Sequence, residues 1–188
     1  MKAAMRTIFV AGAVVLAAGL AGGSAYAADP LTLRSPALED GGTIAAKYSG
    51  NAPPNCTGEN LSPPLAWANP PAGTRSFALI LLDLDGGFGL GFVHMVTYGI
   101  PAEVNGFAEG DLSKPSPKFV GGKSGPGLPT YFGPCPGPGG WHHYVFSLIA
   151  TDLDPKVLPA GLTRDELLSA LKGHAKGAAI LVGRFRHQ

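Results

Sequence analysis

The chain has 188 residues, with 14 Lys and Arg against 13 Asp and Glu, and a formal net charge of +1 at pH 7. This balance excludes a general nucleic-acid binder, because such proteins carry a strongly basic surface that neutralises phosphates. Any attraction for anions must therefore be local.

Residues 1–27 have the pattern of a secretory signal peptide. Two basic residues, Lys2 and Arg6, precede an uncharged, largely apolar run, and residues 25–27 (AYA) form a small-x-small cleavage site. The apolar run is shorter than the roughly 20 residues that a membrane span needs. The sequence therefore predicts a cleaved signal peptide, no stable membrane span, and a single domain at residues 28–188 that is periplasmic or secreted.

Two cysteines, Cys56 and Cys135, remain in the predicted domain. An even number of cysteines in an oxidising compartment indicates a disulfide. It would close a loop of about 80 residues and contribute about 4.5 kcal/mol in the chain-entropy model. Free thiols, or a redox or metal pair, are the alternatives, but the chain has no CxxC motif and two distant cysteines alone make no zinc site.

Short strands open the predicted domain, at residues 31–33 and 43–48, with an acidic, glycine-containing turn between them. Residues 49–71 are rich in Pro, Asn and Gly. Long ordered loops in compact domains are often functional, and the prolines and Trp67 indicate a rigid, packed segment. Residues 105–130 have a similar composition, enriched in Lys, and predict a long surface excursion.

A nearly continuous apolar run at residues 77–82 predicts a strand that is buried on both faces. Asp83 and Asp85 follow at its end, and Asp83 should share the face of the odd-numbered apolar residues. Polar groups are costly to hold beside apolar segments unless they have partners. An acidic strand end that accepts hydrogen bonds from a loop explains the pair most simply; an EF-hand calcium loop needs acidic positions that are absent here.

A glycine-rich turn leads to a second predicted strand at residues 92–98. Strand alternation places Phe92, His94, Val96 and Tyr98 on one face. Taken alone, a histidine flanked by valines is usually a hydrogen-bonded core residue. It becomes a candidate for a site only together with the neighbouring carboxylates.

A stiff loop at residues 131–140 (YFGPCPGPGG) leads into a predicted strand at residues 142–151. His142 and Tyr144 share a face of this strand, and His143 points to the other. We therefore predict that His142 belongs to a pocket, with Tyr144 as an additional hydroxyl donor. Two carboxylates and the histidines at these strand ends predict one small anion-binding pocket.

One helix is predicted late in the chain. Thr163 and Glu166 form a capping box, an apolar stripe follows at helical spacing, and Gly177 should end the helix. Residues 178–185 return to strand. Several strands joined by Gly- and Pro-rich segments, with one late helix, predict a mainly β fold, an antiparallel β-sandwich with a short C-terminal helix.

Other kinds of site fit the sequence less well. The glycines at residues 87–91 lack the spacing of a dinucleotide-binding fingerprint, and residues 122–124 (GKS) lack the first glycine of a phosphate loop. A Gly-x-Ser-x-Gly elbow and an HExxH motif are also missing. A hydrolase that uses the same Asp and His residues, with or without a metal, stays an alternative because imidazole and carboxylate suit zinc or iron. No cofactor is predicted.

Several short motifs follow one another through the predicted domain. They are residues 59–67 (ENLSPPLAW), 71–77 (PAGTRSF), 83–85 (DLD), 91–94 (GFVH), 100–102 (IPA), 131–136 (YFGPCP), 142–146 (HHYVF), 173–174 (GH) and 181–185 (LVGRF). Their order and content closely resemble the phosphatidylethanolamine-binding protein family, in its bacterial, Raf kinase inhibitor-like branch. The resemblance covers nearly the whole predicted domain.

The resemblance implies an antiparallel β-sandwich of the phosphatidylethanolamine-binding type, with a small pocket that binds phosphate-type anions. The predicted ligand-binding residues are Asp83, Asp85, His94, Cys135, His142 and Tyr144. Imidazoles and a tyrosine hydroxyl can donate hydrogen bonds to phosphate oxygens, and a buried Asp can orient a histidine.

Two parts of the pocket motif depart from the family pattern. Leu84 replaces a proline, with Gly86 and Gly87 in place of a segment that usually contains another, which predicts a looser loop. His143 replaces an arginine, which removes a permanent charge and a bidentate donor. We therefore expect phosphate to bind more strongly at pH 6 than at pH 8, where the histidines are neutral.

The sequence thus predicts an exported ligand-binding or protein-inhibiting module more readily than an enzyme. Its expected ligand is a small anion, either phosphate or a phospholipid headgroup. A protein target and a homodimer both stay open.

Overall fold

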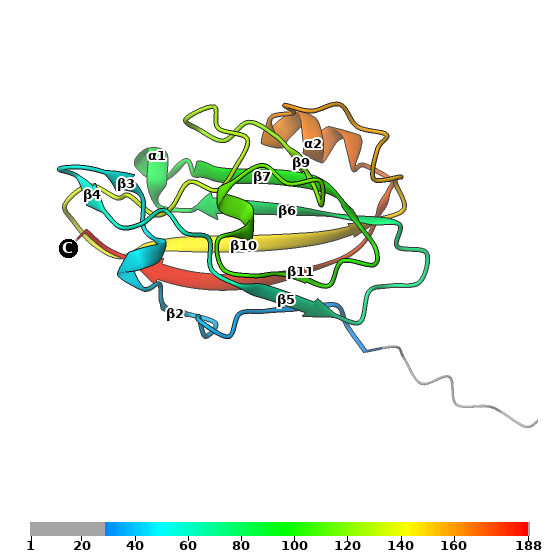
Figure 1. The fold of residues 1–188 in the computed structure, drawn as a ribbon, viewed down its shortest axis with the longest axis horizontal. Helices are drawn as coiled ribbons and strands as arrows, with labels where there is room; N and C mark the ends of the chain where they lie inside the picture. The colour runs from blue at the N-terminus through cyan, green and yellow to red at the C-terminus, as the bar shows by residue number, and fades with distance from the viewer. Residues whose placement is uncertain (1–28, 188) are drawn as a thin grey trace, which may run out of the picture.

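The computed structural model describes residues 29–187, and strands dominate it (Figure 1). The strands are β1 (Thr32–Arg34), β2 (Gly42–Thr43), β3 (Asn51–Ala52), β4 (Cys56–Thr57), β5 (Leu65–Ala68), β6 (Ser76–Asp83), β7 (Phe92–Pro101), β8 (Gly106–Phe107), β9 (Val120–Gly121), β10 (His142–Thr151) and β11 (Ala175–Phe185). The helices are the 3-10 turns η1 (Ala46–Tyr48) and η2 (Asp111–Ser113), the single turn α1 (Gly86–Gly89) and α2 (Arg164–Ala170). The predicted mainly β fold is confirmed.

The long strands form a six-stranded sheet in the order β2-β11-β10-β6-β7-β9. Its pairs are antiparallel, except that the short β2 runs parallel to β11. Asp83, at the end of β6, lies opposite both Phe92 at the start of β7 and Tyr144 near the start of β10. The ends of three neighbouring strands, β6, β7 and β10, therefore meet at one end of the sheet.

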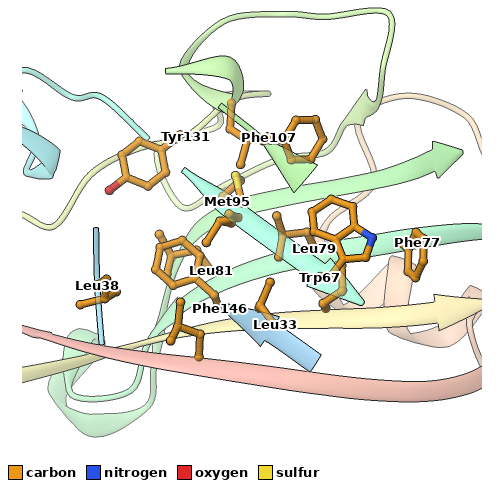
Figure 2. Close-up of a cluster of buried hydrophobic side chains, with 14 of the residues drawn as sticks. Leu33, Leu38, Trp67, Phe77, Leu79, Leu81, Met95, Phe107, Tyr131 and Phe146 are labelled. Atoms are coloured by element: carbon orange, nitrogen blue, oxygen red, sulfur yellow. The ribbon is translucent and has the colours of Figure 1, made fainter. Parts of the chain in front are cut away.

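A three-stranded sheet, β1-β5-β8, covers one face of the large sheet and completes the sandwich. Figure 2 shows Leu33, Trp67 and Phe107 of the small sheet beside Leu79 and Phe146 of the large one. Each of these side chains is at most 6% exposed. Burial of one such side chain contributes about 1.5–3 kcal/mol, so this core holds the two layers together.

The helix α2 covers the opposite face of the large sheet, where Leu167 and Leu171 pack in a second core with Ile80. Its predicted capping box is confirmed. The Thr163 hydroxyl accepts a hydrogen bond from the Glu166 amide at 3.3 Å, and the Glu166 carboxylate accepts one from the Thr163 amide at 2.8 Å. These bonds satisfy amides that the first helical turn leaves without partners.

The predicted end of this helix is wrong. α2 ends at Ala170, and β11 already begins at Ala175, so Gly177 lies inside a strand. The chain reverses at Gly173, whose φ of 80° is readily adopted by glycine. The apolar stripe alone could not reveal this earlier stop.

The prediction that Phe92, His94, Val96 and Tyr98 share one face of β7 is also wrong. The register between β6 and β7 shifts near the end of β6, where β7 contains an extra residue at a β-bulge. Phe92 and His94 consequently lie together at the end of the sheet, with ring centroids 5.1 Å apart, whereas Val96 and Tyr98 face α2.

Three segments differ in detail from the prediction. The strand expected at residues 43–48 is limited to β2, because the amides of Tyr48 and Ser49 bond back to residues 45 and 46 and close the turn η1. Residues 49–71 contain β3, β4 and β5. Residues 105–130 contain β8, η2 and β9, and bury Leu112 in the main core.

The structure also bears on the pairing of the two cysteines and on membrane-spanning helices. The predicted disulfide is confirmed: Cys56 is bonded to Cys135, with Cα atoms 5.6 Å apart. Within residues 29–187, no helix has the length and apolar character to cross a membrane. The signal peptide predicted at residues 1–27 lies outside the described residues.

Candidate functional site

A cavity of about 250 Å³ lies at the end of the large sheet where β6, β7 and β10 meet. Asp83, His94, Cys135 and His142 line it, so four of the six predicted ligand-binding residues share one hollow. Glycines of the α1 turn, the Phe92 and Phe132 rings, and residues 136 and 137 complete the lining. The three strand ends thus meet around one cavity.

Asp83 is a buried carboxylate that accepts hydrogen bonds from three donors. Its Oδ1 atom accepts from the backbone amides of Asp85 and Gly86, each at 3.0 Å. Its Oδ2 atom lies 2.7 Å from Nδ1 of His142. Because a carboxylate only accepts hydrogen bonds, this contact places a proton on Nδ1 of His142. The other ring nitrogen, Nε2, takes no part in this hydrogen bond.

His94 occupies the β-bulge and is only 3% exposed. Its Nδ1 atom lies 2.8 Å from the carbonyl oxygen of Phe132, and the Phe132 amide donates back to the His94 carbonyl at 3.2 Å. The carbonyl can only accept, so Nδ1 carries the proton and Nε2 of the neutral ring is an acceptor. Burial lowers the pKa of His94, although the Phe132 carbonyl and Asp83 oppose that shift.

Tyr144 lies opposite Asp83 in the β6–β10 ladder and is fully buried. Its ring centroid is 5.2 Å from that of His94 and 6.5 Å from that of His142. The hydroxyl has no hydrogen-bond partner among the described residues. Burial raises the pKa of Tyr144, and the charge of Asp83 raises it further, so the group is held as a neutral donor. It lies beside the cavity-lining rings but is not itself part of the lining.

Asp85 does not line the cavity. Its Oδ2 atom accepts hydrogen bonds from the backbone amide of His143 at 2.7 Å and from Nδ1 of His143 at 2.9 Å. The bond from the His143 side chain is the main reason that the pKa of Asp85 is lowered. This exposed pair joins the loop after β6 to β10, on the side of the strands away from the cavity. Its predicted role in ligand binding stays a prediction.

The turn α1 depends on glycine beside the carboxylate. A Cβ atom at Gly86 would lie 2.7 Å from Cβ of Phe92 and 3.1 Å from Oδ2 of Asp83. The next residues, Gly87 and Phe88, have φ values of 59° and 62°. The absence of a side chain at Gly86 therefore allows Asp83 and Phe92 to approach each other from adjacent strands.

Phe92, Phe132 and Pro136 also line the cavity, although they are not among the predicted ligand-binding residues. Phe132 and Pro136 lie in the proline- and glycine-rich loop that was noted only for its stiffness. The signal available for them was their position in the YFGPCP motif, next to Cys135.

A larger cavity, of about 590 Å³, lies between residues 31–40 and β11. No histidine lines it. The smaller cavity is the better candidate site, because a buried carboxylate and two imidazoles converge on it. In the part of the chain that the structure describes, no group of three or more His, Cys, Asp or Glu residues is placed to hold a metal ion.

Comparison with known proteins identifies relatives along most of the chain. The family model described as phosphatidylethanolamine-binding protein matches residues 34–186. A UPF0098 protein of Methanothermobacter thermautotrophicus is 35% identical over 158 residues, which cover 83% of this chain and 99% of that protein. LppC of Mycobacterium tuberculosis (strain H37Rv), named as a candidate lipoprotein, is 39% identical over 165 residues, which cover 86% of this chain and 75% of LppC.

Two solved structures share the fold. YbcL of Escherichia coli, described as a member of the mammalian PEBP family, superposes with a TM-score of 0.76 at 25% identity, covering 85% of this chain and 100% of YbcL. CT736 of Chlamydia trachomatis, described as a candidate homologue of phosphatidylethanolamine-binding protein, gives a TM-score of 0.73 at 29% identity. That match covers 85% of this chain and 99% of CT736.

Proposed function

Since this chain belongs to the phosphatidylethanolamine-binding protein family, we propose that it is an exported binding module that takes a phosphate-type anion into the cavity beside Asp83. The ligand class is inorganic phosphate or a phosphomonoester headgroup. The observation that carries the proposal is the convergence of His94 and His142 on one cavity, each with its Nδ1 atom already engaged.

Both histidines have their Nδ1 protons committed to protein oxygens. Protonation of either ring therefore occurs at Nε2, the nitrogen that has no partner among Asp83 and Phe132. A protonated Nε2 donates a charge-assisted hydrogen bond, the kind that phosphate oxygens accept best. Two such donors that line one small cavity favour a compact anion with several oxygens.

The cavity also contains the negative charge of Asp83, which opposes an anion unless a proton enters with it. Burial lowers the pKa of His94, so this ring is biased towards its neutral form without ligand. A bound anion favours the protonated form, and anion binding is therefore coupled to proton uptake. We expect affinity to increase as pH falls from 8 to 6.

Export is supported by three independent features. The first 27 residues have a signal-like pattern, the Cys56–Cys135 disulfide is typical of oxidising compartments, and the relative LppC is named as a candidate lipoprotein. The proposal therefore places the mature chain in the periplasm or outside the cell.

Calorimetric titration with inorganic phosphate at pH 6 and pH 8 tests the proposal. We expect binding that is at least fivefold tighter at pH 6, and loss of that binding in a His94→Ala/His142→Ala double variant. His174→Ala is the matched control, because His174 forms another histidine–aspartate pair, 2.7 Å from Asp152, just outside β11 and away from the cavity. Equal phosphate binding by the double variant and the wild type would refute the proposed site.

The wild type and a single His94→Ala variant test the alternative hydrolase. Turnover of p-nitrophenyl phosphate that disappears in His94→Ala would favour an enzyme, whereas phosphate binding without turnover favours a binding module. No observation on the described residues specifically favours hydrolysis, so we propose a binding module rather than an enzyme.

A further inference from the structure

One wall of the anion cavity is formed by strands of the large sheet, and the opposite wall is formed by a loop. Asp83, His94 and His142 project from paired strands of the large sheet. The opposite wall is formed by the loop that connects residue 131 to β10, through Phe132, Cys135 and residues 136–137. The sheet wall is fixed by the strand ladders, so the shape of the cavity depends on what fixes the loop.

The first part of the loop is held by hydrogen bonds. Phe132 exchanges bonds with His94, and the Gly133 amide donates to Oδ1 of Asn60 at 2.8 Å. The carbonyl of Pro134 accepts from the Gly50 amide at 2.9 Å. These contacts position the chain up to residue 134.

The second part, residues 135–141, takes no part in any backbone–backbone hydrogen bond of the described chain. It consists of CPGPGGW, in which the prolines have no amide proton to donate. A Cβ atom at Gly137, Gly139 or Gly140 would meet no atom within 4 Å, so neighbouring structure does not confine these positions. The covalent link from Cys135 to Cys56 is the strongest restraint on this part of the loop.

There is also room for the loop to move outward. Its later residues border a second cavity of about 500 Å³, lined by Gly139, Trp141, Arg186 and His187 among others. At the end of the loop, Trp141 rests against two guanidiniums, 4.9 Å from Arg186 and 5.7 Å from Arg184. The loop thus borders the anion cavity at residues 135–137 and the second cavity at Gly139 and Trp141, and both cavities leave space for its movement.

We propose that the Cys56–Cys135 disulfide is a positioning element of the anion site, and that its reduction opens the loop wall and weakens anion binding. Cys56 is anchored in the β3–β4 hairpin, opposite Ala52, so the disulfide fixes Cys135 relative to that hairpin. The inference rests on the proposed anion-binding function and adds a dependence on thiol–disulfide state.

The chemical step is a thiol–disulfide exchange with a dithiol reductant. The dithiol supplies two electrons and two protons, the Cys56–Cys135 bond breaks to give two thiols, and the dithiol closes to its own disulfide. In the reverse exchange, the disulfide form of the dithiol accepts two electrons and two protons from the Cys56 and Cys135 thiols, and the wall is rebuilt. A dithiol-dependent partner could in this way set the fraction of chains that hold the anion.

The binding test is a calorimetric titration of inorganic phosphate at pH 6 into three proteins. They are the oxidised wild type, the wild type reduced with dithiothreitol, and a Cys56→Ser/Cys135→Ser variant. We expect phosphate affinity at least tenfold lower in the second and third than in the first. Circular dichroism on the same samples establishes that the sheet is intact.

Leu171→Ala is the control for a general loss of stability. Leu171 lies in the second core, on the α2 side of the sheet, away from the loop. In its oxidised form, this variant should melt at a lower temperature than the wild type and yet bind phosphate within twofold of it. Its reduced form should bind phosphate more weakly.

A second measurement needs no ligand. In a Trp67→Phe variant, Trp141 is the single tryptophan, because the chain contains two. The buried indole nitrogen of Trp67 has no hydrogen-bond partner among the described residues, so this substitution removes no such bond. Reduction should raise acrylamide quenching of Trp141 at least twofold as the loop loosens.

Three outcomes would overturn the inference. Phosphate affinity within twofold of the oxidised value in a folded, reduced protein would do so, as would unchanged quenching of Trp141. Loss of the whole sheet on reduction would show a global rather than a local role for the disulfide. If the oxidised wild type binds no phosphate, the proposed function fails, and the quenching result alone decides whether the disulfide positions the loop.

Discussion

Two aspartate–histidine pairs join the start of β10 to the end of β6 and the turn that follows it, and they differ strongly in their exposure to solvent. In the pair formed by Asp83 and His142, the carboxylate side chain is 5% exposed. In the pair formed by Asp85 and His143, the carboxylate is 42% exposed. The distances from Nδ1 to the carboxylate oxygen are almost equal, 2.7 and 2.9 Å.

The difference arises from strand alternation. Successive residues of β10 point to opposite faces, so His142 reaches the cavity and His143 does not. The inner pair is surrounded by low-dielectric protein, where a hydrogen-bonded charge contributes more and an unpaired one costs more. The outer pair is solvated and contributes as a surface ion pair. Equal geometry therefore does not imply equal energy or equal function.

The largest expected effect comes from removing the inner carboxylate. Asp83→Ala leaves His142 and the amides of Asp85 and Gly86 without their acceptor, so we expect the free energy of unfolding to fall by about 2–4 kcal/mol. Urea denaturation measures this loss. Phosphate titration should show at least tenfold weaker binding, because His142 loses the carboxylate that orients its ring, and we expect this loss to outweigh the removal of a negative charge. A loss below about 0.5 kcal/mol would contradict the assignment of Asp83 as the buried anchor of the site.

The next largest effect is a pH dependence of the free energy of unfolding that arises from His94. An unfolded chain has a histidine pKa near 6.5, and burial lowers the pKa of His94 in the folded protein. Below about pH 6.5 the unfolded state binds more protons, so stability falls as the pH drops towards the folded pKa, by about 1.4 kcal/mol for each unit of pKa depression.

Urea denaturation of the wild type and His94→Gln between pH 7.5 and 5.5, in a phosphate-free buffer, isolates this contribution. The wild type should lose more stability than the variant. Added phosphate should reduce the loss if it binds the protonated ring. Parallel curves for the two proteins would contradict a lowered pKa for His94.

A smaller effect is expected at the outer pair. Asp85→Ala removes an exposed acceptor of two hydrogen bonds from His143. Exposed pairs contribute about 0.2–1 kcal/mol, so the free energy of unfolding should fall by that amount. Phosphate affinity should stay within twofold of the wild type. A tenfold loss of affinity would instead support the sequence-based prediction that Asp85 binds the ligand.

The smallest effect is expected for His143→Arg, which restores the arginine of the family pattern. Because position 143 faces away from the cavity, we expect a change in stability within about 0.5 kcal/mol. Phosphate affinity measured by calorimetry at pH 8 should change less than twofold. A large gain in affinity at pH 8 would show that a long cationic side chain at this position reaches the anion from outside the cavity.

Much of this arrangement follows from the sequence, for reasons visible in particular strands. The segment predicted as a strand at residues 142–151 is β10 with the same bounds. Simple alternation was enough to place Asp83 on the face of Leu79 and Leu81, and His142 on the face of Tyr144. Regular pairing between long antiparallel strands makes such reasoning reliable.

Other parts depend on interactions that a single sequence does not display. The β-bulge at His94 inserts one residue into β7 and breaks the alternation, so the histidine was assigned the wrong neighbours along its strand. Phe132 reaches His94 from a loop 38 residues away. The direction of Asp85 is decided by the turn after β6, where Gly86 allows the chain to fold back beside Asp83.

The parallel pairing of β2 with β11 has a consequence for how the chain acquires this structure. Gly42 and Thr43 lie beside Gly183 and Arg184, so one edge of the sheet joins segments from opposite ends of the described chain. During synthesis the edge cannot form until β11 has emerged. Contacts between such distant segments slow folding, because the ordering entropy is lost before the contacts form. Newly made chains should therefore remain unfolded for longer than chains whose sheet edges join neighbouring segments.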